Sequence, residues 1–230
     1  MRILTWNLFH GRSLPAAGRS LGDEFAGLLA SWSWDVALLQ EVPPWWPERL
    51  AAAAGAEQRR ALTSRNSLLA LRRALAERWP DALKSNGGGA NAVLSRAGIA
   101  EHRAVRLRLR PERRVAQLVR LGDGVVVANY HGSTRVAPAE EELARLWDLA
   151  RRFAAGAPLV LGGDLNLRAP QAPPAAVHLG RRDVDHVFAL GLGPATPAGT
   201  LDRRVTLRGQ AVELSDHPPL LAQARSPATG

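Results

Sequence analysis

The chain has 230 residues, a length that fits one large domain or two small ones, and 46% of the residues are hydrophobic, which is enough for a sizeable core. It contains no cysteine, so disulfides and thiolate metal sites are excluded, and a metal would need oxygen and imidazole ligands, which favours Mg²⁺, Mn²⁺ or Ca²⁺. The formal net charge of +9 can attract nucleic acid or anionic lipid, but Lys84 is the only lysine, and a GC-rich genome would produce the same arginine bias.

The chain also lacks the features of a membrane-spanning or exported protein. No apolar run reaches the roughly 18 residues that a transmembrane helix needs. The first residues, 2–8, have the apolar pattern of a buried strand, and no signal peptide precedes them. No repeat or low-complexity linker divides the sequence. We therefore expect a monomeric cytoplasmic protein with a single domain over residues 1–225.

The first half of the chain alternates strand and helix patterns. The predicted strands cover residues 2–8, 35–41, 59–64 and 91–96, the predicted helices cover 20–31, 45–54 and 68–79, and a flexible loop is predicted at 86–89. The first two strands end in the oxygen donors Asn7 and Glu41. A carboxylate at the tip of an apolar strand is costly unless it is solvated, paired or bound to a cation, so Glu41 is a candidate ligand. Asn7 could offer a neutral oxygen or make a turn.

Arginines alternate with apolar residues in the middle of the chain. Arg106, Arg108 and Arg110 occur at a period of two, which predicts that they share one face of a strand. The simplest interpretation is a solvated face. The alternative is a phosphate-binding or nucleic-acid-binding surface, to which Arg113 and Arg114 would add.

The second half begins with a hairpin predicted over residues 115–121 and 125–130. His131 follows its second strand, and a lone histidine there is more often structural than catalytic. A helix is predicted from Pro138 to Arg152, since acidic residues fill its first turn and arginines its last. The remaining predicted segments are a strand at 159–166, a proline-rich loop at 171–176, a strand at 183–189 and a closing apolar segment that ends at 224.

The stretch at 159–166 is an apolar run that ends in two glycines, a carboxylate and an amide. Gly162 and Gly163 allow the backbone to turn sharply and to approach a neighbour closely. Asp164 and Asn166 are two residues apart, so in an extended chain they point to one side. There they could hold a metal, a water or a phosphate oxygen. The other interpretation is a strand that ends in an Asx turn.

Polar residues recur at the ends of apolar segments throughout the chain. The set consists of Asn7, Glu41, His131, Asp164, Asn166, Asp185, Asp216 and His217. If the strands share a sheet and these ends converge, they form one pocket of carboxylates, amides and imidazoles. Such donors suit a hard cation and a phosphate ester.

The same segments resemble those of the endonuclease/exonuclease/phosphatase superfamily. In chain order they are TWN at 5–7, LQE at 39–41, NAVLSR at 91–96, NYH at 129–131, GGDLN at 162–166, DHV at 185–187 and SDHP at 215–218. Their order matches the family over nearly the whole chain. The resemblance implies an α/β fold, a four-layer α/β sandwich in which two packed mixed β-sheets are flanked by helices. It also implies metal-dependent phosphoester hydrolysis.

Carried over residue by residue, the resemblance assigns catalytic roles to five of these residues. Asp164 would orient or deprotonate the attacking water, and Asn166 would bind a phosphate oxygen. His217, oriented by Asp185, would face the phosphate, and His131 would add a second imidazole donor.

The resemblance also implies a metal cofactor and its ligands. Asn7 and Glu41 would hold Mg²⁺, for which Mn²⁺ could substitute, and Asp216 would lie at or near the same cluster. These are oxygen donors, as a hard cation requires.

Three hypotheses remain for the substrate. The first is a DNA endonuclease or exonuclease, which the net charge and the arginines at 106, 108, 110 and 114 favour. The second is a phosphatase or phosphodiesterase acting on lipid headgroups or small phosphate esters. Trp45 and Trp46 could then enter a membrane, or they could simply pack a helix. The third is a catalytically inactive binding scaffold, which the complete set of polar residues disfavours.

Overall fold

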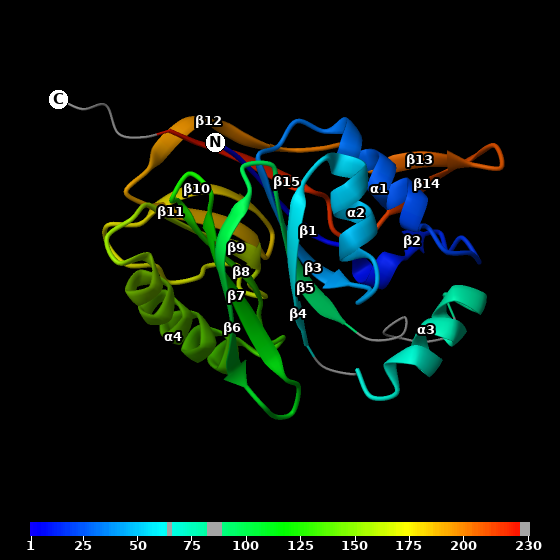
Figure 1. Ribbon diagram of the computed structural model, residues 1–230, viewed down its shortest axis with the longest axis horizontal. Helices are drawn as coiled ribbons and strands as arrows, with labels where there is room; N and C mark the ends of the chain where they lie inside the picture. Colours follow the sequence, from blue (N-terminus) through cyan, green and yellow to red (C-terminus); the bar gives the residue numbers. More distant parts are fainter. Residues whose placement is uncertain (64–65, 82–88, 226–230) are drawn as a thin grey trace.

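The computed structural model describes residues 1–63, 66–81 and 89–225, and most of the loop predicted at 86–89 lies outside these ranges. Two six-stranded sheets dominate it (Figure 1). The first sheet has the order β12 (Gly193–Thr200), β15 (Leu220–Arg225), β1 (Arg2–Asn7), β3 (Val36–Val42), β5 (Ala90–Ser95) and β4 (Glu57–Leu62). The second has the order β10 (Val177–Arg182), β11 (Asp185–Leu190), β9 (Leu159–Asp164), β8 (Val126–His131), β7 (Arg114–Leu121) and β6 (Ile99–Arg108).

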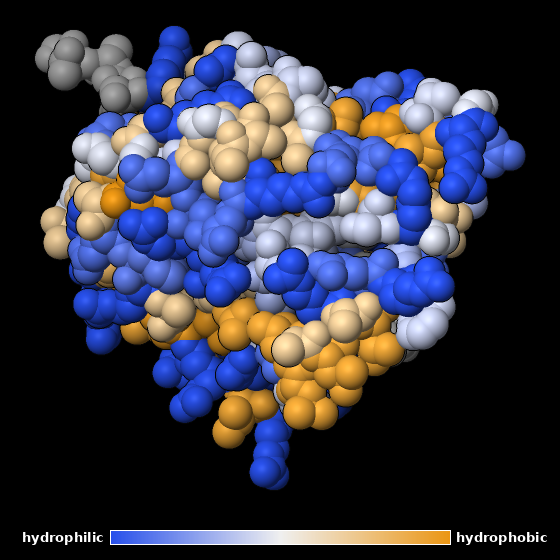
Figure 2. Space-filling view, turned by 45° about the vertical axis from the view of Figure 1, so that its right-hand side comes forward, coloured by the Kyte–Doolittle hydropathy of each residue, from blue (hydrophilic) through white to orange (hydrophobic). Residues whose placement is uncertain are grey.

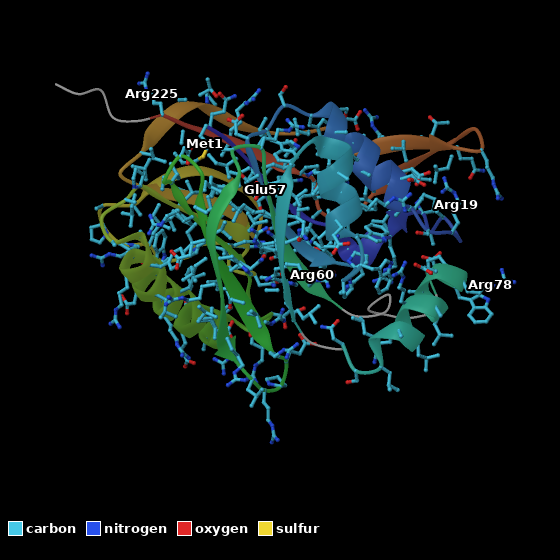
Figure 3. All side chains as sticks on the ribbon, in the orientation of Figure 1. Met1, Arg19, Glu57, Arg60, Arg78 and Arg225 are labelled. Atoms are coloured by element: carbon cyan, nitrogen blue, oxygen red, sulfur yellow. The ribbon has the colours of Figure 1, made fainter. Side chains whose placement is uncertain are left out.

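Alternation of apolar side chains along the strands explains why the sheets stack. In β1, Ile3 faces the second sheet, whereas Leu4 and Trp6 face the helices, because successive strand residues point to opposite sides. The core between the sheets consists largely of valine, leucine and isoleucine, including Val36, Leu38, Val93, Val119, Val127, Val160 and Val187. Side chains from both sheets fill this space in Figure 3.

Helices cover the two outer faces. Helices α1 (Gly22–Ser31) and α2 (Pro47–Ala54) pack on the first sheet, and α4 (Val136–Ala154) packs on the second. The predicted four-layer α/β sandwich is therefore confirmed. A fourth helix, α3 (Leu69–Arg78), lies at the margin of the molecule (Figure 1). No helix among the described residues combines the length and apolarity needed to cross a membrane.

Five strands were not predicted. They are β2 (Ser13–Leu14), β10, β12, β13 (Arg204–Leu207) and β14 (Gln210–Leu214), and β2, β13 and β14 form a small third sheet. Strands β10 and β12 are sheet edges that expose most of their residues, so they lack the apolar alternation of a half-buried strand. The sequence of β12, GPATPAGT, is rich in glycine and proline, which rarely occupy interior strands.

Two amides tie the sheets together near one end of the sandwich. The Nε2 of Gln40 donates to the Oδ1 of Asn129 at 2.8 Å, and the Nδ2 of Asn129 donates to the carbonyl oxygens of Leu39 and Ala92 at 3.0 and 2.9 Å. Both amide side chains are fully buried. Because buried polar groups are costly unless they are hydrogen-bonded, this network favours one alignment of the two sheets. It places Glu41 opposite His131, because Glu41 is the residue after Gln40 and His131 is two residues after Asn129.

Trp46 is 4% exposed, and its ring centroid lies 5.4 Å from that of Phe25. Trp45 is partly buried against the same core. The interpretation of these tryptophans as helix-packing residues is confirmed for Trp46.

A buried histidine predicts how stability depends on pH. His186 is fully buried, its Nε2 lies 2.8 Å from the carbonyl oxygen of Leu167, and its Nδ1 lies 3.1 Å from the Nε2 of His178. Burial lowers the pKa of His186 from 6.5 to about 4. The neutral imidazole therefore contributes stability that is complete above about pH 6.5 and is lost as the pH falls toward 4, because the unfolded chain binds the proton more tightly.

We expect the free energy of unfolding, measured by urea titration, to decrease as the pH is lowered from 6.5 to about 4. The fall should be smaller in His186→Gln, whose amide can still donate a hydrogen bond but does not titrate. An equal fall in both proteins would contradict this account.

Candidate active site

The predicted polar residues converge at one end of the sandwich. In the second sheet Asp164, the last residue of β9, pairs in register with His131 of β8 on one side and with Asp185 of β11 on the other. The first sheet brings Asn7 and Glu41 to the same end, since β1 and β3 run parallel and Asn7 pairs with Gln40.

One pocket of about 260 Å³ collects most of these side chains. Seven predicted residues line it, namely Asn7, Glu41, His131, Asp164, Asn166, Asp216 and His217. The eighth, Asp185, is buried behind His217. The structure therefore brings the whole strand-end set together.

His217 and Asp185 form a hydrogen-bonded pair. The Nδ1 of His217 lies 2.9 Å from the Oδ2 of Asp185. Burial alone would lower the pKa of His217, but the hydrogen bond to Asp185 and the charges of Asp185, Asp164 and Asp216 outweigh it and raise this pKa to about 9. Burial, together with the charge of Asp164, raises the pKa of Asp185 to about 6 against the opposing effect of His217. At neutral pH the pair is an imidazolium and a carboxylate.

The segment before His217 is fixed by three hydrogen bonds. The Oγ of Ser215 donates to the carbonyl oxygen of Asn7 at 2.6 Å and accepts the backbone N–H of His217 at 3.0 Å. The indole Nε1 of Trp6 donates to the carbonyl oxygen of His217 at 2.9 Å. The imidazole is thus positioned by β1 as well as by Asp185.

Asp164 is 2% exposed and receives two amide hydrogen bonds. The Nδ2 of Asn7 donates to its Oδ2, and the backbone N–H of Asn166 donates to its Oδ1, both at 3.0 Å. The same Oδ2 lies 3.5 Å from the Nε2 of His131 and 3.9 Å from the Nε2 of His217. Asp164 is therefore the central carboxylate, with an imidazole on each side.

Asn166 does not continue the strand. Its φ is +53°, and its backbone N–H bonds to the Asp164 side chain, which is an Asx turn. The expectation that an extended chain points both residues to one side is wrong; the turn brings Asn166 into the pocket. There its Nδ2 donates to the carbonyl oxygen of Gly132 at 3.0 Å. The Asx-turn interpretation is confirmed, and the side chains of Asp164 and Asn166 both line the pocket, where their binding of a metal, a water or a phosphate oxygen stays a prediction.

Gly163 permits a close backbone approach, as the sequence predicts. Its φ is +142°, and an added Cβ would lie 1.9 Å from the carbonyl oxygen of Tyr130. A side chain at this position would push β8 and β9 apart and separate His131 from Asp164.

Glu41 is directed into the pocket by an irregularity of β3. The register between β3 and β5 shifts between Leu39 and Val42, and Glu41 has a φ of +50°. Its Oε2 lies 3.1 Å from the Nε2 of His10, and its Oε1 lies 3.9 Å from the Nε2 of His131. Non-glycine residues with positive φ are strained and occur most often at functional sites, and His10, Asn166 and Ser215 beside this pocket share the feature.

The two pocket imidazoles next to Asp164 differ in charge. Burial lowers the pKa of His131, and the charges of Asp164 and Glu41 oppose this only in part. His131 is therefore neutral at pH 7, whereas His217 is protonated. Asp164 therefore lies between one neutral and one cationic imidazole.

Four pocket residues were missed by the sequence analysis. They are Phe9, His10, Arg12 and Thr134. Phe9 and His10 belong to the short 3₁₀ turn η1 (Phe9–Gly11), which directly follows Asn7. The guanidinium of Arg12 lies 4.1 Å from the centroid of the Phe9 ring. Their nearness to a strand end was a usable signal, but a loop without periodicity gives no side-chain direction.

Two groups of side chains could hold a metal ion. Asn7, Glu41 and Asp216, the predicted ligands, all line the pocket and offer oxygen donors. Ligand atoms of Asp164, Asp185 and His217 lie within 4.8 Å of one another, and the Oδ1 of Asp185 is buried with no hydrogen-bond partner among the described residues. Both groups fit a hard cation by donor chemistry. In the second group, a metal would compete with the hydrogen bond between Asp185 and His217.

The four predicted phosphate-binding arginines do not form one surface. The register between β6 and β7 shifts between Arg106 and Arg108, and β6 ends at Arg108, so Arg110 lies beyond the strand. The prediction of a single arginine face is therefore wrong, because a bulge interrupts the period of two. Arg114 is 8% exposed and pairs with Glu112 at 2.9 Å. Only Arg106 and Arg110 of the four are exposed.

Arg108 is part of a buried structural network. Its guanidinium pairs with Glu141 at 2.9 Å and with Glu142, which is 2% exposed. Glu142 also accepts hydrogen bonds from the hydroxyl of Tyr130 and from the Oγ and backbone N–H of Ser133, the last two at 2.8 and 3.1 Å. This network attaches α4 to the end of β8, next to His131.

We expect Glu142→Gln to lower the free energy of unfolding by roughly 1–3 kcal/mol, because an amide presents hydrogens to donors that need an acceptor. Glu141→Gln is the matched control, since Glu141 contacts the same arginine but its side chain is 74% exposed. Urea titration of both variants measures the difference. Equal stabilities would show that the buried network contributes nothing.

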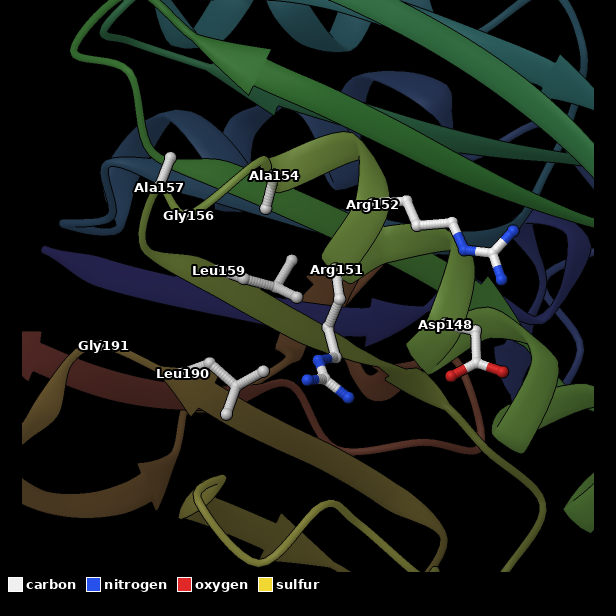
Figure 4. Close-up of a pocket in the computed structure, with 9 residues that line it drawn as sticks. All are labelled: Asp148, Arg151, Arg152, Ala154, Gly156, Ala157, Leu159, Leu190 and Gly191. Carbon is white, nitrogen blue, oxygen red and sulfur yellow. The ribbon is translucent and has the colours of Figure 1, made fainter.

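A second pocket, of about 530 Å³, lies at the opposite end of the second sheet (Figure 4). Leu159 at the start of β9 and Leu190 at the end of β11 form its apolar part, and Asp148, Arg151 and Arg152 of α4 border it. It contains none of the eight predicted polar site residues.

Comparison with known proteins gives one family and a shared fold. A family model described as "Endonuclease/Exonuclease/phosphatase family" matches residues 4–217. No curated protein is similar enough to count as a match. An endonuclease/exonuclease/phosphatase from Beutenbergia cavernae is similar at 22% identity and a TM-score of 0.73, over 98% of this chain and 71% of that one.

Two further structures have the same fold. TDP2 from Caenorhabditis elegans is 18% identical with a TM-score of 0.69, over 96% of this chain and 73% of its own. A mannosyl-6-phosphatase from Bacteroides thetaiotaomicron is 14% identical with a TM-score of 0.71, over 98% and 99%. At these identities the likeness concerns the fold.

Proposed function

The chain belongs to the endonuclease/exonuclease/phosphatase family, and from that membership we propose that its strand-end pocket is the catalytic centre of a metal-dependent phosphoester hydrolase. Membership supports the reaction class. The observation that carries the location is the row formed by His131, Asp164 and Asp185, with His217 hydrogen-bonded to Asp185. Asp164 of this row is the carboxylate base, and His217 beside it is the protonated donor.

Asp164 is the proposed base. Its two oxygens are oriented by Asn7 and by the backbone of Asn166, so the carboxylate has a fixed direction. A water placed against it would lose its proton to Asp164 as its oxygen attacks phosphorus. The neutral His131, 3.5 Å from the same carboxylate, can hydrogen-bond a phosphate oxygen or the water without repelling a cation.

His217 is the proposed donor on the phosphate. Negative charge gathers on the phosphoryl oxygens and on the leaving oxygen as the ester breaks, and preorganised donors aimed at that charge lower the barrier. The Nε2 of the imidazolium can supply such a hydrogen bond or a proton. Asp185 holds the Nδ1 and keeps the ring protonated. The Nδ2 of Asn166 donates to the carbonyl oxygen of Gly132. If it gives up this hydrogen bond, it can donate to a phosphate oxygen instead.

Asn7, Glu41 and Asp216 are the proposed Mg²⁺ ligands, and Mn²⁺ can take the same donors. The oxygen of the Asn7 side chain accepts the backbone N–H of Phe9 at 2.9 Å, and a carbonyl oxygen has a second lone pair for a cation. The ion, when bound, neutralises charge on the phosphate. His10 holds one oxygen of Glu41, which leaves the other directed toward His131.

We expect EDTA to abolish hydrolysis and Mg²⁺ or Mn²⁺ to restore it. By isothermal titration, Glu41→Gln should weaken Mg²⁺ binding at least about tenfold, because it removes a charged ligand. Asp183→Asn, at an exposed position, is the control. Hydrolysis that survives chelation would contradict the metal dependence. If Asp185→Asn loses Mg²⁺ binding while Glu41→Gln binds as the wild type does, the ion is held by the second group of ligands, Asp164, Asp185 and His217.

For the substrate, the proposal is DNA. The net charge of +9, the exposed Arg106 and Arg110, and Arg12 in the pocket support a polyanion. The alternative is a lipid headgroup or small phosphate ester, since the neighbours of this fold include both TDP2 and a mannosyl-6-phosphatase. Arg108 and Arg114 are paired with glutamates instead of facing a polyanion, which weakens the case for DNA and strengthens the alternative.

Nicking of supercoiled plasmid in Mg²⁺ tests the DNA proposal, with Asp164→Ala as the control for a contaminating nuclease. Nicking by the wild type alone is the expected result. Hydrolysis of small phosphate esters without any nicking would overturn DNA as substrate and leave the reaction class standing.

A further inference from the structure

We propose that α3, together with the turn between β6 and β7, docks this chain on an anionic lipid bilayer. This goes beyond the proposed hydrolysis and does not depend on it. The docking surface consists of Leu62, Leu68, Leu71, Trp79 and Leu109, whose side chains are 37%, 75%, 55%, 55% and 58% exposed. Single exposed leucines are ordinary, but five large apolar side chains on adjoining elements form an interaction surface.

An apolar stripe runs along α3 and includes the residues at its two ends. Leu71 and Leu75 are four residues apart within the helix, and Leu68 and Trp79 are its cap residues, whose backbone is not right-handed helical. In an ordinary surface helix such a stripe is buried. Here Ala76 is the only fully buried residue of α3, and it lies beside the stripe rather than within it. Leu68, Leu71 and Trp79 are therefore exposed, whereas Leu75 is half-buried.

Basic side chains border the stripe on both sides. Arg72 is four residues from Leu68, and Arg78 is three residues from Leu75, so each adjoins the stripe on a different flank. Arg78 extends outward from the molecule in Figure 3. The acidic residue of α3, Glu77, pairs with Arg73 at 2.8 Å on another side of the helix. Exposed apolar side chains next to arginines match the chemistry of an anionic membrane interface.

The turn between β6 and β7 continues the same surface. Leu109 and Arg110 are exposed there, and a groove joins this turn to Ser67, two residues before α3 begins. Leu62, Ser67 and Leu109 all line that groove. Hydrophobic residues gather along the lower part of the face in Figure 2, with hydrophilic residues beside them. Two separate elements thus offer an apolar tip with an arginine next to it.

Charge complementarity selects the occupant. A second copy of the chain would bring Arg72, Arg78 and Arg110 against their own counterparts, which repel. Nucleic acid would satisfy the arginines, but it would leave the leucines and Trp79 exposed. An anionic bilayer satisfies both, because its phosphates attract the arginines and its acyl boundary accepts the apolar side chains.

The part of the docking surface formed by Leu62 and the turn between β6 and β7 lies at the end of the sandwich that carries the strand-end pocket. Leu62 pairs with Ala90, and Ala90 pairs with Val42, the residue after Glu41. In the second sheet, β7 begins at Arg114 and runs antiparallel to β8, which ends at His131. Docking would therefore hold the pocket close to the headgroup region.

Co-sedimentation with phosphatidylcholine vesicles, with and without phosphatidylglycerol, tests the proposal on the full chain. We expect binding to the anionic vesicles only, and weakening of that binding by salt. The double variant Leu71→Ser/Trp79→Ser should lower the partition coefficient at least about tenfold, because it removes two inserting side chains. Leu14→Ser, at a leucine that is 46% exposed on another sheet, should bind as the wild type does.

Circular dichroism and hydrolysis of a soluble phosphate ester establish that the variants are folded. If the double variant does not fold, Leu68→Ser and Arg78→Glu separately decide the question, since both side chains are exposed. Absence of wild-type binding, or wild-type binding by folded variants, overturns the proposal. The proposal is also overturned if the wild type forms a dimer in analytical ultracentrifugation and the double variant does not. It is likewise overturned if the double variant loses affinity for DNA while the wild type does not bind vesicles.

Discussion

Replacing His217 with alanine is expected to lower kcat/KM for phosphoester hydrolysis by about 10³-fold or more, because it removes the cationic donor from the transferring phosphate. The imidazole is half-buried, is hydrogen-bonded to Asp185 and carries a pKa raised to about 9. The other imidazole beside Asp164, that of His131, is neutral at this pH because burial lowers its pKa.

The pH profile separates this role from a merely structural one. A raised pKa keeps His217 protonated below about pH 9, so the wild-type rate should hold through neutral pH and fall as the pH rises past that value. Asp185→Asn removes the charge that raises this pKa, so its rate should fall at a lower pH. Asp183→Asn is the matched control, because Asp183 is exposed and pairs with Arg168 instead. Identical profiles for the two variants would contradict the pairing.

Replacing Asp164 with alanine is expected to have an effect of similar size, about 10³-fold or more on kcat, because the attacking water loses its base. The carboxylate is held by two amide hydrogen bonds and flanked by two imidazoles, so no neighbouring group has its position. Asp164→Asn, which keeps the shape, should be as inactive as alanine. A substantial rate in Asp164→Asn would show that Asp164 orients the water through hydrogen bonds and does not take its proton.

His102→Ala serves as the control for both active-site substitutions, since His102 lies on β6 and does not line the pocket. Thermal unfolding of each variant distinguishes loss of chemistry from loss of fold. Rates near wild type in either His217→Ala or Asp164→Ala would remove that residue from the mechanism.

The central strands were predictable because they are apolar on both faces, whereas the four-layer arrangement was predicted from the family resemblance. Residues 2–8, 35–41 and 159–166 were predicted as strands from their apolar pattern, and the structure buries β1, β3 and β9 between helices and the other sheet. Edge strands such as β10 and β12 were not predictable, because an exposed edge carries no apolar alternation. Their pairing depends on a neighbouring strand that is distant in sequence.

The site residues were predictable as a set, but their local geometry was not. Polar side chains at strand ends converge where the two packed sheets end together, and this brings Glu41 of the first sheet and Asp164 of the second into one pocket. The direction of each side chain depends on the irregularity at Glu41 and the Asx turn at Asn166, which sequence periodicity does not encode. The predicted arginine face failed for the same kind of reason, since one bulge between Arg106 and Arg108 reverses the pattern.

The exposed stripe of α3 shows a further limit of sequence patterns. A helical spacing of leucines predicts a helix, but it does not say whether the stripe faces a core or a partner. The structure leaves Leu71 and Trp79 exposed. That exposure makes α3 a proposed docking element.

Hydrolysis of bis(p-nitrophenyl) phosphate by the purified chain, with Mg²⁺ or with EDTA and beside Asp164→Ala, tests the central claim most directly. The account predicts release of p-nitrophenol by the wild type in Mg²⁺, and none with EDTA or in the variant. Release that persists in EDTA, or that Asp164→Ala sustains at the wild-type rate, would contradict metal-dependent phosphoester hydrolysis in this pocket.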